Sequence, residues 1–128
     1  PAATTVAGSR SGGNQQKAIA GRELDKEHSL LVAVQPTRGL DVGAIESIHK
    51  RIVEDRDKGN GVLLVSLELD EVRNLSDLIY VRYEGEIVGA FLPKETTAEE
   101  MGLYRAGAKR RSQEERDKVI AKEENKHE

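Results

Sequence analysis

Two glycines followed by polar side chains stand near the start of the chain, a spacing suited to binding phosphate. Residues 10–17 read RSGGNQQK and precede a stretch with helical periodicity that runs to about residue 26. Glycines before a helix let the backbone approach a ligand closely, and the helix N-terminus offers free N–H groups and positive potential. Ser11 and Asn14 could add side-chain hydrogen bonds. The alternative is a Gly-rich turn in which one of these two residues only caps the helix, because a short glycine motif is not specific by itself.

A second stretch that could carry chemistry follows the apolar run from Leu30 to Val34. Such a run, bounded by turn residues, predicts a strand buried on both faces, as in parallel sheets. Pro36 ends the strand because it has no backbone N–H to donate. Ligands gather beyond the carboxyl ends of strands in open parallel sheets, so Gln35 to Asp41 are the first residues to consider. Asp41 also suits the N-cap of the next helix, and that role alone could account for it.

The composition excludes several classes of function. The chain has 128 residues and a net charge of −3, so bulk charge gives no argument for nucleic-acid binding. It has no cysteine, which excludes disulfides and thiolate chemistry. An independent hydrolase is poorly supported, because no Ser-His-acid or metal-ligand spacing appears around the scattered residues His28, His49 and His127. No apolar run approaches the roughly 20 residues that cross a bilayer, and we see no signal peptide, so we expect any membrane association to come through a partner.

The hydrophobic pattern predicts an α/β fold around one strand–helix–strand unit. A helix is expected over residues 42–58, and a second apolar strand over residues 62–66. One face of the helix carries a stripe formed by Ile45, Ile48, Ile52 and Val53. His49 lies beside this stripe, where packing or solvation is the commoner role. Two strands joined by a helix in this way should be parallel.

The rest of the chain is predicted to add a hairpin and further helices. A short acidic helix is expected over residues 67–75. Strands over residues 78–83 and 86–92 flank the Glu-Gly pair at 84–85, which is a hairpin signal. The sequence TAEE at residues 97–100 is a capping-box pattern that opens a helix.

Three segments, taken in this order and at this spacing, resemble the ATP-binding subunits of ABC transporters. Residues 11–17 (SGGNQQK) look like the signature motif of that family. Residues 36–44 (PTRGLDVGA) resemble the segment after the Walker B strand, including the D-loop. Residues 66–77 and 83–88 resemble the switch region and the hairpin that follows it. The sequences of these segments are most similar to the second ATPase cassette of sugar and nucleoside importers. Within that group, EMGL at residues 100–103 is more typical of the nucleoside importers.

The resemblance implies a partial P-loop-NTPase-like sheet. We expect a frayed N-terminus over residues 1–8, the C-terminal part of an ABC ATPase cassette over residues 9–108, and a charged helical or disordered tail over residues 109–128. In this family the strand before the phosphate loop lies between the switch-region strand and the following hairpin, and that strand is missing here. Backbone groups on both sides would lose partners, so we expect the chain to rearrange or to be marginally stable.

The departures from the family pattern concern catalysis. The Walker B positions for a Mg²⁺-binding Asp and a water-orienting Glu carry Val34 and Gln35, and Leu67 stands where the family has its switch His. Valine offers no oxygen to a hard cation, and a glutamine amide is no general base. Arg10 replaces the usual Leu beside the signature, and the sequence contains no G-x-x-x-x-G-K-[ST] phosphate loop. We expect this chain alone neither to bind Mg²⁺ nor to hydrolyse ATP.

The resemblance also implies a division of labour between two cassettes. Each ATP in this family lies between the phosphate loop of one cassette and the signature motif of the other. The residues that would reach ATP across this interface are Ser11, Gly12, Gly13, Asn14 and Gln15, while Asp41 would couple the two sites. The expected partners are the N-terminal ATPase cassette of the same protein and transmembrane permease subunits, which would hold it at the cytoplasmic face of the cell membrane during nucleoside or sugar import. The alternative, from another class, is a stand-alone non-catalytic α/β interaction module.

Overall fold

The predicted strand–helix–strand unit is present in the structure. The computed structural model describes residues 3–9 and 29–126. The first apolar run forms β2 (Leu30–Val34), which pairs in parallel with β3 (Gly61–Ser66). The helix α2 (Val42–Asp57) connects these two strands and buries Ile52 from its apolar stripe. The parallel pairing that the sequence predicts is therefore confirmed.

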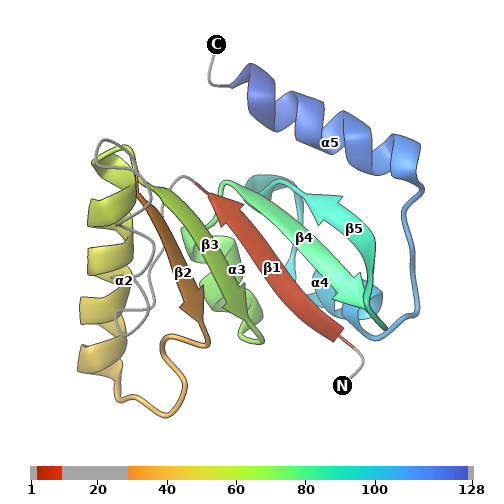
Figure 1. Ribbon diagram of the computed structural model, residues 1–128. Helices are drawn as coiled ribbons and strands as arrows, with labels where there is room; N and C mark the ends of the chain where they lie inside the picture. Colours follow the sequence, from red (N-terminus) through yellow and green to blue (C-terminus); the bar gives the residue numbers. More distant parts are fainter. Residues whose placement is uncertain (1–2, 10–28, 127–128) are drawn as a thin grey trace.

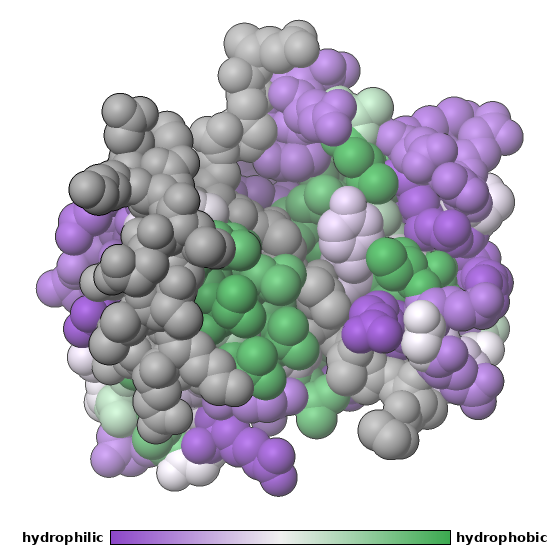
Figure 2. Space-filling view, viewed as in Figure 1, coloured by the Kyte–Doolittle hydropathy of each residue, from purple (hydrophilic) through white to green (hydrophobic). Residues whose placement is uncertain are grey.

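The strand β2 is fully buried on one face only. Leu31 and Ala33 are 5% and 0% exposed, whereas Leu30 and Val34 keep 47% and 44% of their surface exposed. Successive side chains of a strand point to opposite faces, so these two pairs belong to different faces of the sheet. Figure 2 shows apolar side chains gathered near the middle of the viewed face. The prediction of burial on both faces is wrong for Leu30 and Val34, because the buried core cluster, which includes Ala33 of this strand and Ile52 of α2, lies on the opposite face of the strand.

The predicted hairpin also forms. Its strands β4 (Leu78–Tyr83) and β5 (Glu86–Phe91) pair antiparallel across a turn at Glu84 and Gly85. Both turn residues have a positive φ, +49° and +80° respectively. This backbone twist matches the right-handed twist of the flanking strands, which explains why a Glu-Gly pair closes the hairpin.

The N-terminal residues form a strand in the middle of the sheet. The strand β1 (Ala3–Ser9) lies between β3 and β4 and is antiparallel to both, so the five-stranded sheet has the order β2-β3-β1-β4-β5 (Figure 1). The expectation of a frayed N-terminus is therefore wrong for residues 3–8. Without β1, the strands β3 and β4 would each leave a row of backbone groups unpaired inside the sheet. In the structure, the N-terminal segment of this chain lies between these two strands and completes the sheet.

Two helices pack on the sheet and close the core. The helices α3 (Leu69–Leu75) and α4 (Ala98–Arg105) lie together behind the sheet in Figure 1, and the short 3-10 helix η1 (Pro93–Glu95) stands between β5 and α4. Their apolar side chains meet those of the hairpin in one buried cluster, which includes Val72, Leu75, Ile79, Val81, Phe91, Met101 and Tyr104. This packing fixes α3, and with it the segment that follows β3.

The charged tail contains a helix. The helix α5 (Gln113–Asn125) begins at a complete capping box between Ser112 and Glu115, packs beside β5, and buries none of its own residues. Burial raises the pKa of Tyr80 in β4, and the carboxylates of Glu124 and Asp117 in α5 raise it further. Of the two alternatives for residues 109–128, the structure has the helix.

Candidate functional site

The loop at the carboxyl end of β2 is the first part of the site. The backbone N–H of Gln35 still bonds the carbonyl of Val65 at 2.7 Å, and the chain then leaves the sheet through two short turns. Gly39 has a φ of +76°, a left-handed conformation that glycine adopts without strain. The loop ends at Asp41, whose Oδ1 accepts a hydrogen bond from the backbone N–H of Ala44 at 2.8 Å. The predicted N-cap role of Asp41 is confirmed, and its side chain is exposed at the start of α2.

The structure brings into direct contact Gln35 and Leu67, which are two of the three positions that the resemblance marks as substituted catalytic residues. The side-chain oxygen of Gln35 accepts a hydrogen bond from the backbone N–H of Leu67 at 3.3 Å. The carbonyl of Leu67 accepts another from Nη1 of Arg105 in α4, at 2.6 Å. Val34, the third position, lies at the end of β2, and both its side chain and that of Leu67 are exposed and apolar. The side chains of Val34 and Leu67 offer no oxygen to a metal ion. The side-chain oxygen of Gln35 already accepts the backbone N–H of Leu67.

A buried polar cluster joins the loop to two helices. Oγ1 of Thr37 donates a hydrogen bond to Oε2 of Glu71 in α3 at 2.5 Å. The same carboxylate oxygen lies 2.6 Å from Nε2 of His49 in α2. Thr37 and Glu71 are 7% and 6% exposed, so this is an interior contact. Oε1 of Glu71 is also buried and has no hydrogen-bond partner among the described residues.

Sequence reasoning missed this cluster, although a signal was present. His49 falls four residues after Ile45 and three before Ile52, which places it on the inward side of α2. Glu71 directly precedes the buried Val72 and lies four residues before the buried Leu75. A polar side chain at an inward helical position needs a partner, because burying it unpaired is costly. Such positions therefore indicate a contact, but they do not identify its partner.

A surface hollow of about 430 Å³ opens beside the cluster. Its lining combines the loop with the facing sides of α2 and α3, and consists of Thr37, Arg38, Gly39, Leu40, Ile45, His49, Glu68, Asp70, Glu71 and Asn74. Three of these side chains are acidic, and one is an arginine. Among the residues that the structure describes, no group of three or more His, Asp or Glu side chains is arranged to hold a metal ion.

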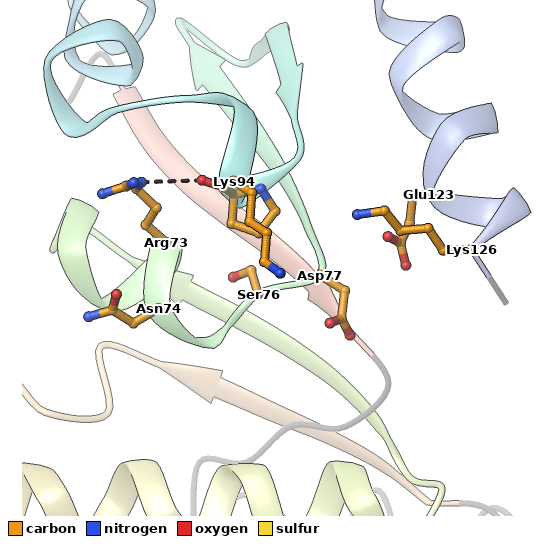
Figure 3. Close-up of a pocket in the computed structure, with 8 residues that line it drawn as sticks. Arg73, Asn74, Ser76, Asp77, Lys94, Glu123 and Lys126 are labelled. Atoms are coloured by element: carbon orange, nitrogen blue, oxygen red, sulfur yellow. Dashed lines mark hydrogen bonds between the residues drawn. The ribbon is translucent and has the colours of Figure 1, made fainter.

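A second hollow, of about 470 Å³, lies between α3, η1 and α5 (Figure 3). Arg73 donates a hydrogen bond from Nε to the carbonyl of Pro93 at 3.2 Å, so this cation of the lining is bonded to the backbone. The remaining charged lining residues are Asp77, Lys94, Glu123 and Lys126. Cations and carboxylates are mixed here, and the Ser76 hydroxyl in the lining is buried without a hydrogen-bond partner among the described residues. This hydroxyl is therefore not bonded to a described side chain that could act as its base.

The residues predicted to bind ATP fall outside the described part of the chain. They are Ser11, Gly12, Gly13, Asn14 and Gln15. Their prediction stays a prediction, as does the helix expected to follow them. None of the helices that the structure describes is both long enough and apolar enough to cross a membrane.

Comparison with known proteins gives a consistent set of relatives. The chain is 59% identical over 104 residues to the guanosine import ATP-binding protein NupO of Bacillus subtilis (strain 168), a match that covers 81% of the chain and 20% of that relative. It is 55% identical over 101 residues to the nucleoside import ATP-binding protein NupA of Lactococcus lactis subsp. cremoris (strain MG1363), covering 79% of the chain and 20% of the relative. No protein-family model matches the chain.

A more distant relative is a sugar importer protein. The ribose import ATP-binding protein RbsA of Caldanaerobacter subterraneus subsp. tengcongensis is 43% identical over 97 residues, which is 76% of the chain and 20% of that protein. The chain thus spans about a fifth of the length of the relatives it matches. The resemblance inferred from the three motif-like segments is confirmed by these relatives. Over about four-fifths of its length, the chain belongs to the ATP-binding proteins of ABC-type nucleoside and sugar importers, as a part of such a protein.

Proposed function

We propose that the chain is the part of an ABC importer ATP-binding protein that supplies the signature motif to an ATP site held by another cassette. The imported solute would be a nucleoside or a simple sugar. The observation that carries the proposal is the identity of 59% with a guanosine import ATP-binding protein over a match that spans most of the chain. In this arrangement residues 11–15 contact the phosphates of ATP, and Asp41 couples the two sites.

The chain alone would not hydrolyse ATP. The geometry at the ends of β2 and β3 supports this part of the proposal, because Gln35 is bonded to the backbone of Leu67 and Val34 offers no metal ligand. Catalysis would then depend on a phosphate loop, a metal-binding Asp and a general base supplied by the N-terminal cassette. Mg²⁺ would bind together with that ATP, and the residues of this chain would not serve as its ligands.

Permease subunits are the proposed membrane partners. None of the described helices is able to span a bilayer, so the proposal places the protein at the cytoplasmic face through these subunits. The relatives are named for guanosine, nucleoside and ribose import, and these names define the solute classes to test first.

A chimaera tests the proposal directly. In the guanosine import ATP-binding protein of Bacillus subtilis, the 104 matching residues would be replaced by those of this chain, and ATP-dependent guanosine uptake would be measured in cells lacking the original protein. We expect the chimaera to support uptake and Gly12→Asp to abolish it, since a carboxylate would be placed against the phosphates. The matched control is Gly85→Asp, in a hairpin turn with open space around the position where a Cβ would stand.

One observation favours a second function. The strand β1 completes the sheet from within the chain, which suits a stand-alone non-catalytic interaction module. Under that alternative, Gly12→Asp matters no more than Gly85→Asp in any assay. A folded chimaera that imports guanosine equally well with either substitution would favour the module over the signature-motif role.

A further inference from the structure

We propose that Glu71 is a positioning residue, whose buried carboxylate fixes the loop from Gln35 to Asp41 against α3 and α2 and so sets where Asp41 is presented. The inference rests on the proposed function, because it concerns how this chain couples two ATP sites. It adds a residue that the signature motif and the loop itself do not contain.

The first support is that the contacts of Glu71 join residues that are far apart in the sequence. Glu71 receives Thr37 from 34 residues earlier in the chain and His49 from 22 residues earlier, both on its Oε2 atom. One oxygen atom therefore holds three separate elements: the loop, α2 and α3. Because both distances are short and Thr37 and Glu71 are more than nine-tenths buried, water competes poorly for these bonds.

The second support is how the loop is held elsewhere. Apart from the bond of Gln35 N–H to the carbonyl of Val65 in β3, its backbone hydrogen bonds within the loop are local turns. They run from Arg38 N–H to the carbonyl of Gln35 at 3.3 Å and from Leu40 N–H to the carbonyl of Thr37 at 3.2 Å. Its long-range side-chain bonds join Gln35 to Leu67 and Thr37 to Glu71, and both partners lie in the segment from Leu67 to Glu71. The loop and this segment are thus tied together at two points, and Thr37 is the tie nearer to Asp41.

The third support is that the cluster is a poor device for stability alone. Glu71 leaves one buried oxygen without a partner in the described structure, and an unpaired buried carboxylate oxygen costs free energy. Replacing all members of a buried charged cluster with well-packed apolar side chains of similar volume is often neutral or stabilising. The unpaired oxygen is therefore better explained by the geometry that the carboxylate imposes on the loop than by its contribution to stability.

Hydrogen exchange on the complete 128-residue chain tests the positioning role. We expect Glu71→Met to speed amide exchange at Arg38 and Leu40 by about tenfold or more, and by more than at the amides of β3. The melting temperature should fall, because Thr37 and His49 lose their shared acceptor. Thr37→Val should have the same effect on exchange, and Thr37→Ser, which keeps the hydroxyl, should restore slow exchange. Unchanged exchange at both amides in Glu71→Met and Thr37→Val would overturn the proposal.

The chain contains a matched control. Thr96 donates a hydrogen bond from Oγ1 to Oε1 of Glu100 at 2.6 Å, a Thr–Glu pair of the same chemistry at the start of α4. Glu100→Met should leave exchange at Arg38 and Leu40 unchanged. Equal acceleration by Glu71→Met and Glu100→Met would mean a general loosening of the fold and would also overturn the proposal.

Guanosine uptake by the chimaera tests whether the position of the loop matters for function. There, Glu71→Met should lower uptake about tenfold or more, and adding Asp41→Ala should cause little further loss, because both changes disable the same loop. Normal uptake by Glu71→Met in a chimaera that imports guanosine would overturn the positioning role alone. A chimaera that imports nothing would instead overturn the proposed function, while the exchange experiment would still decide whether Glu71 positions the loop.

Discussion

The side chain of Gln35 accepts a hydrogen bond from the backbone N–H of Leu67 at 3.3 Å, which ties together the ends of two neighbouring parallel strands. The resemblance predicts that a competent ATPase of this family carries its catalytic Glu and its switch His at these two positions. Here the two positions bond each other. Gln35 adopts a φ of +47°, a conformation that costs a non-glycine residue free energy, and this bond helps to hold it there.

Restoring the carboxylate at this position should not restore catalysis. In Gln35→Glu the new side chain can still accept the bond from Leu67, but Val34 offers no metal ligand and Leu67 offers no imidazole. We expect phosphate release from Mg-ATP by the 128-residue chain to stay at the level of buffer alone, before and after the substitution. Release above that level that depends on Gln35→Glu would contradict this account of the site.

Gly107 occupies a position where a side chain would collide with a ring. Its φ is +81°, and an added Cβ would lie 2.5 Å from Cζ of Tyr83. Gly85 has nearly the same φ, +80°, with nothing within 4 Å of its added Cβ. We expect both Gly→Ala changes to lower the free energy of unfolding by about 1–2 kcal/mol for the backbone, and Gly107→Ala by about 1–3 kcal/mol more for the overlap. Urea denaturation measures both, and equal losses would show that Tyr83 moves aside freely.

Local patterns predicted much of the fold. The apolar runs of β2 and β3, the stripe on α2, and the Glu84-Gly85 turn each define an element within a few residues, and all of these elements formed. The predicted caps also formed, because Asp41 and Thr97 bond backbone groups only three residues away.

Contacts between distant residues were not predictable in the same way. The strand β1 has a small, polar sequence with no periodicity, and it is a strand because β3 and β4 need a partner on each side. The bonds of Glu71 to Thr37 and His49, and of Arg105 to Leu67, join residues 22 to 38 positions apart. Only the fold brings these groups together, so the sequence indicated the loop of the candidate site but not what holds it.

Arg111 should contribute more to stability than the neighbouring Arg110. Its guanidinium lies 4.2 Å from the centroid of the Phe91 ring, and Nη1 bonds the carbonyl of Ala90 at 3.1 Å. Arg110 instead pairs with Glu86 at 3.0 Å with both side chains more than half exposed, which is a weak arrangement. In thermal or urea unfolding, we expect Arg111→Ala to cost about 1–3 kcal/mol and Arg110→Ala less than about 1 kcal/mol. Similar losses for the two variants would show that the ring contact contributes nothing measurable.

The capping box of α5 should respond to acid. The backbone N–H of Ser112 donates to Oε1 of Glu115 at 2.9 Å, and the backbone N–H of Glu115 donates to Oγ of Ser112 at 3.1 Å. The backbone hydrogen bond from Ser112 lowers the pKa of Glu115 below its usual value of 4.5, and the Ser112 side chain adds to this. The folded pKa is below the unfolded one, so the contribution of Glu115 is fully present above pH 4.5 and is lost as the pH falls through the lowered value.

An NMR pH titration of the Glu115 side-chain carboxyl carbon and the Ser112 amide checks this linkage. We expect both signals to titrate together with a midpoint below 4.5, and Ser112→Ala to move the Glu115 midpoint back toward that value. In Glu115→Gln the side-chain amide oxygen can still accept the hydrogen bond from the Ser112 N–H, so α5 should still begin at the same residue. The chemical shift of the Ser112 amide should then no longer change with acid, because residue 115 has no carboxyl group to titrate. A Glu115 midpoint at or above 4.5 in the unsubstituted chain would mean that the box does not hold the carboxylate in solution, and α5 would then begin through the remaining helix contacts alone.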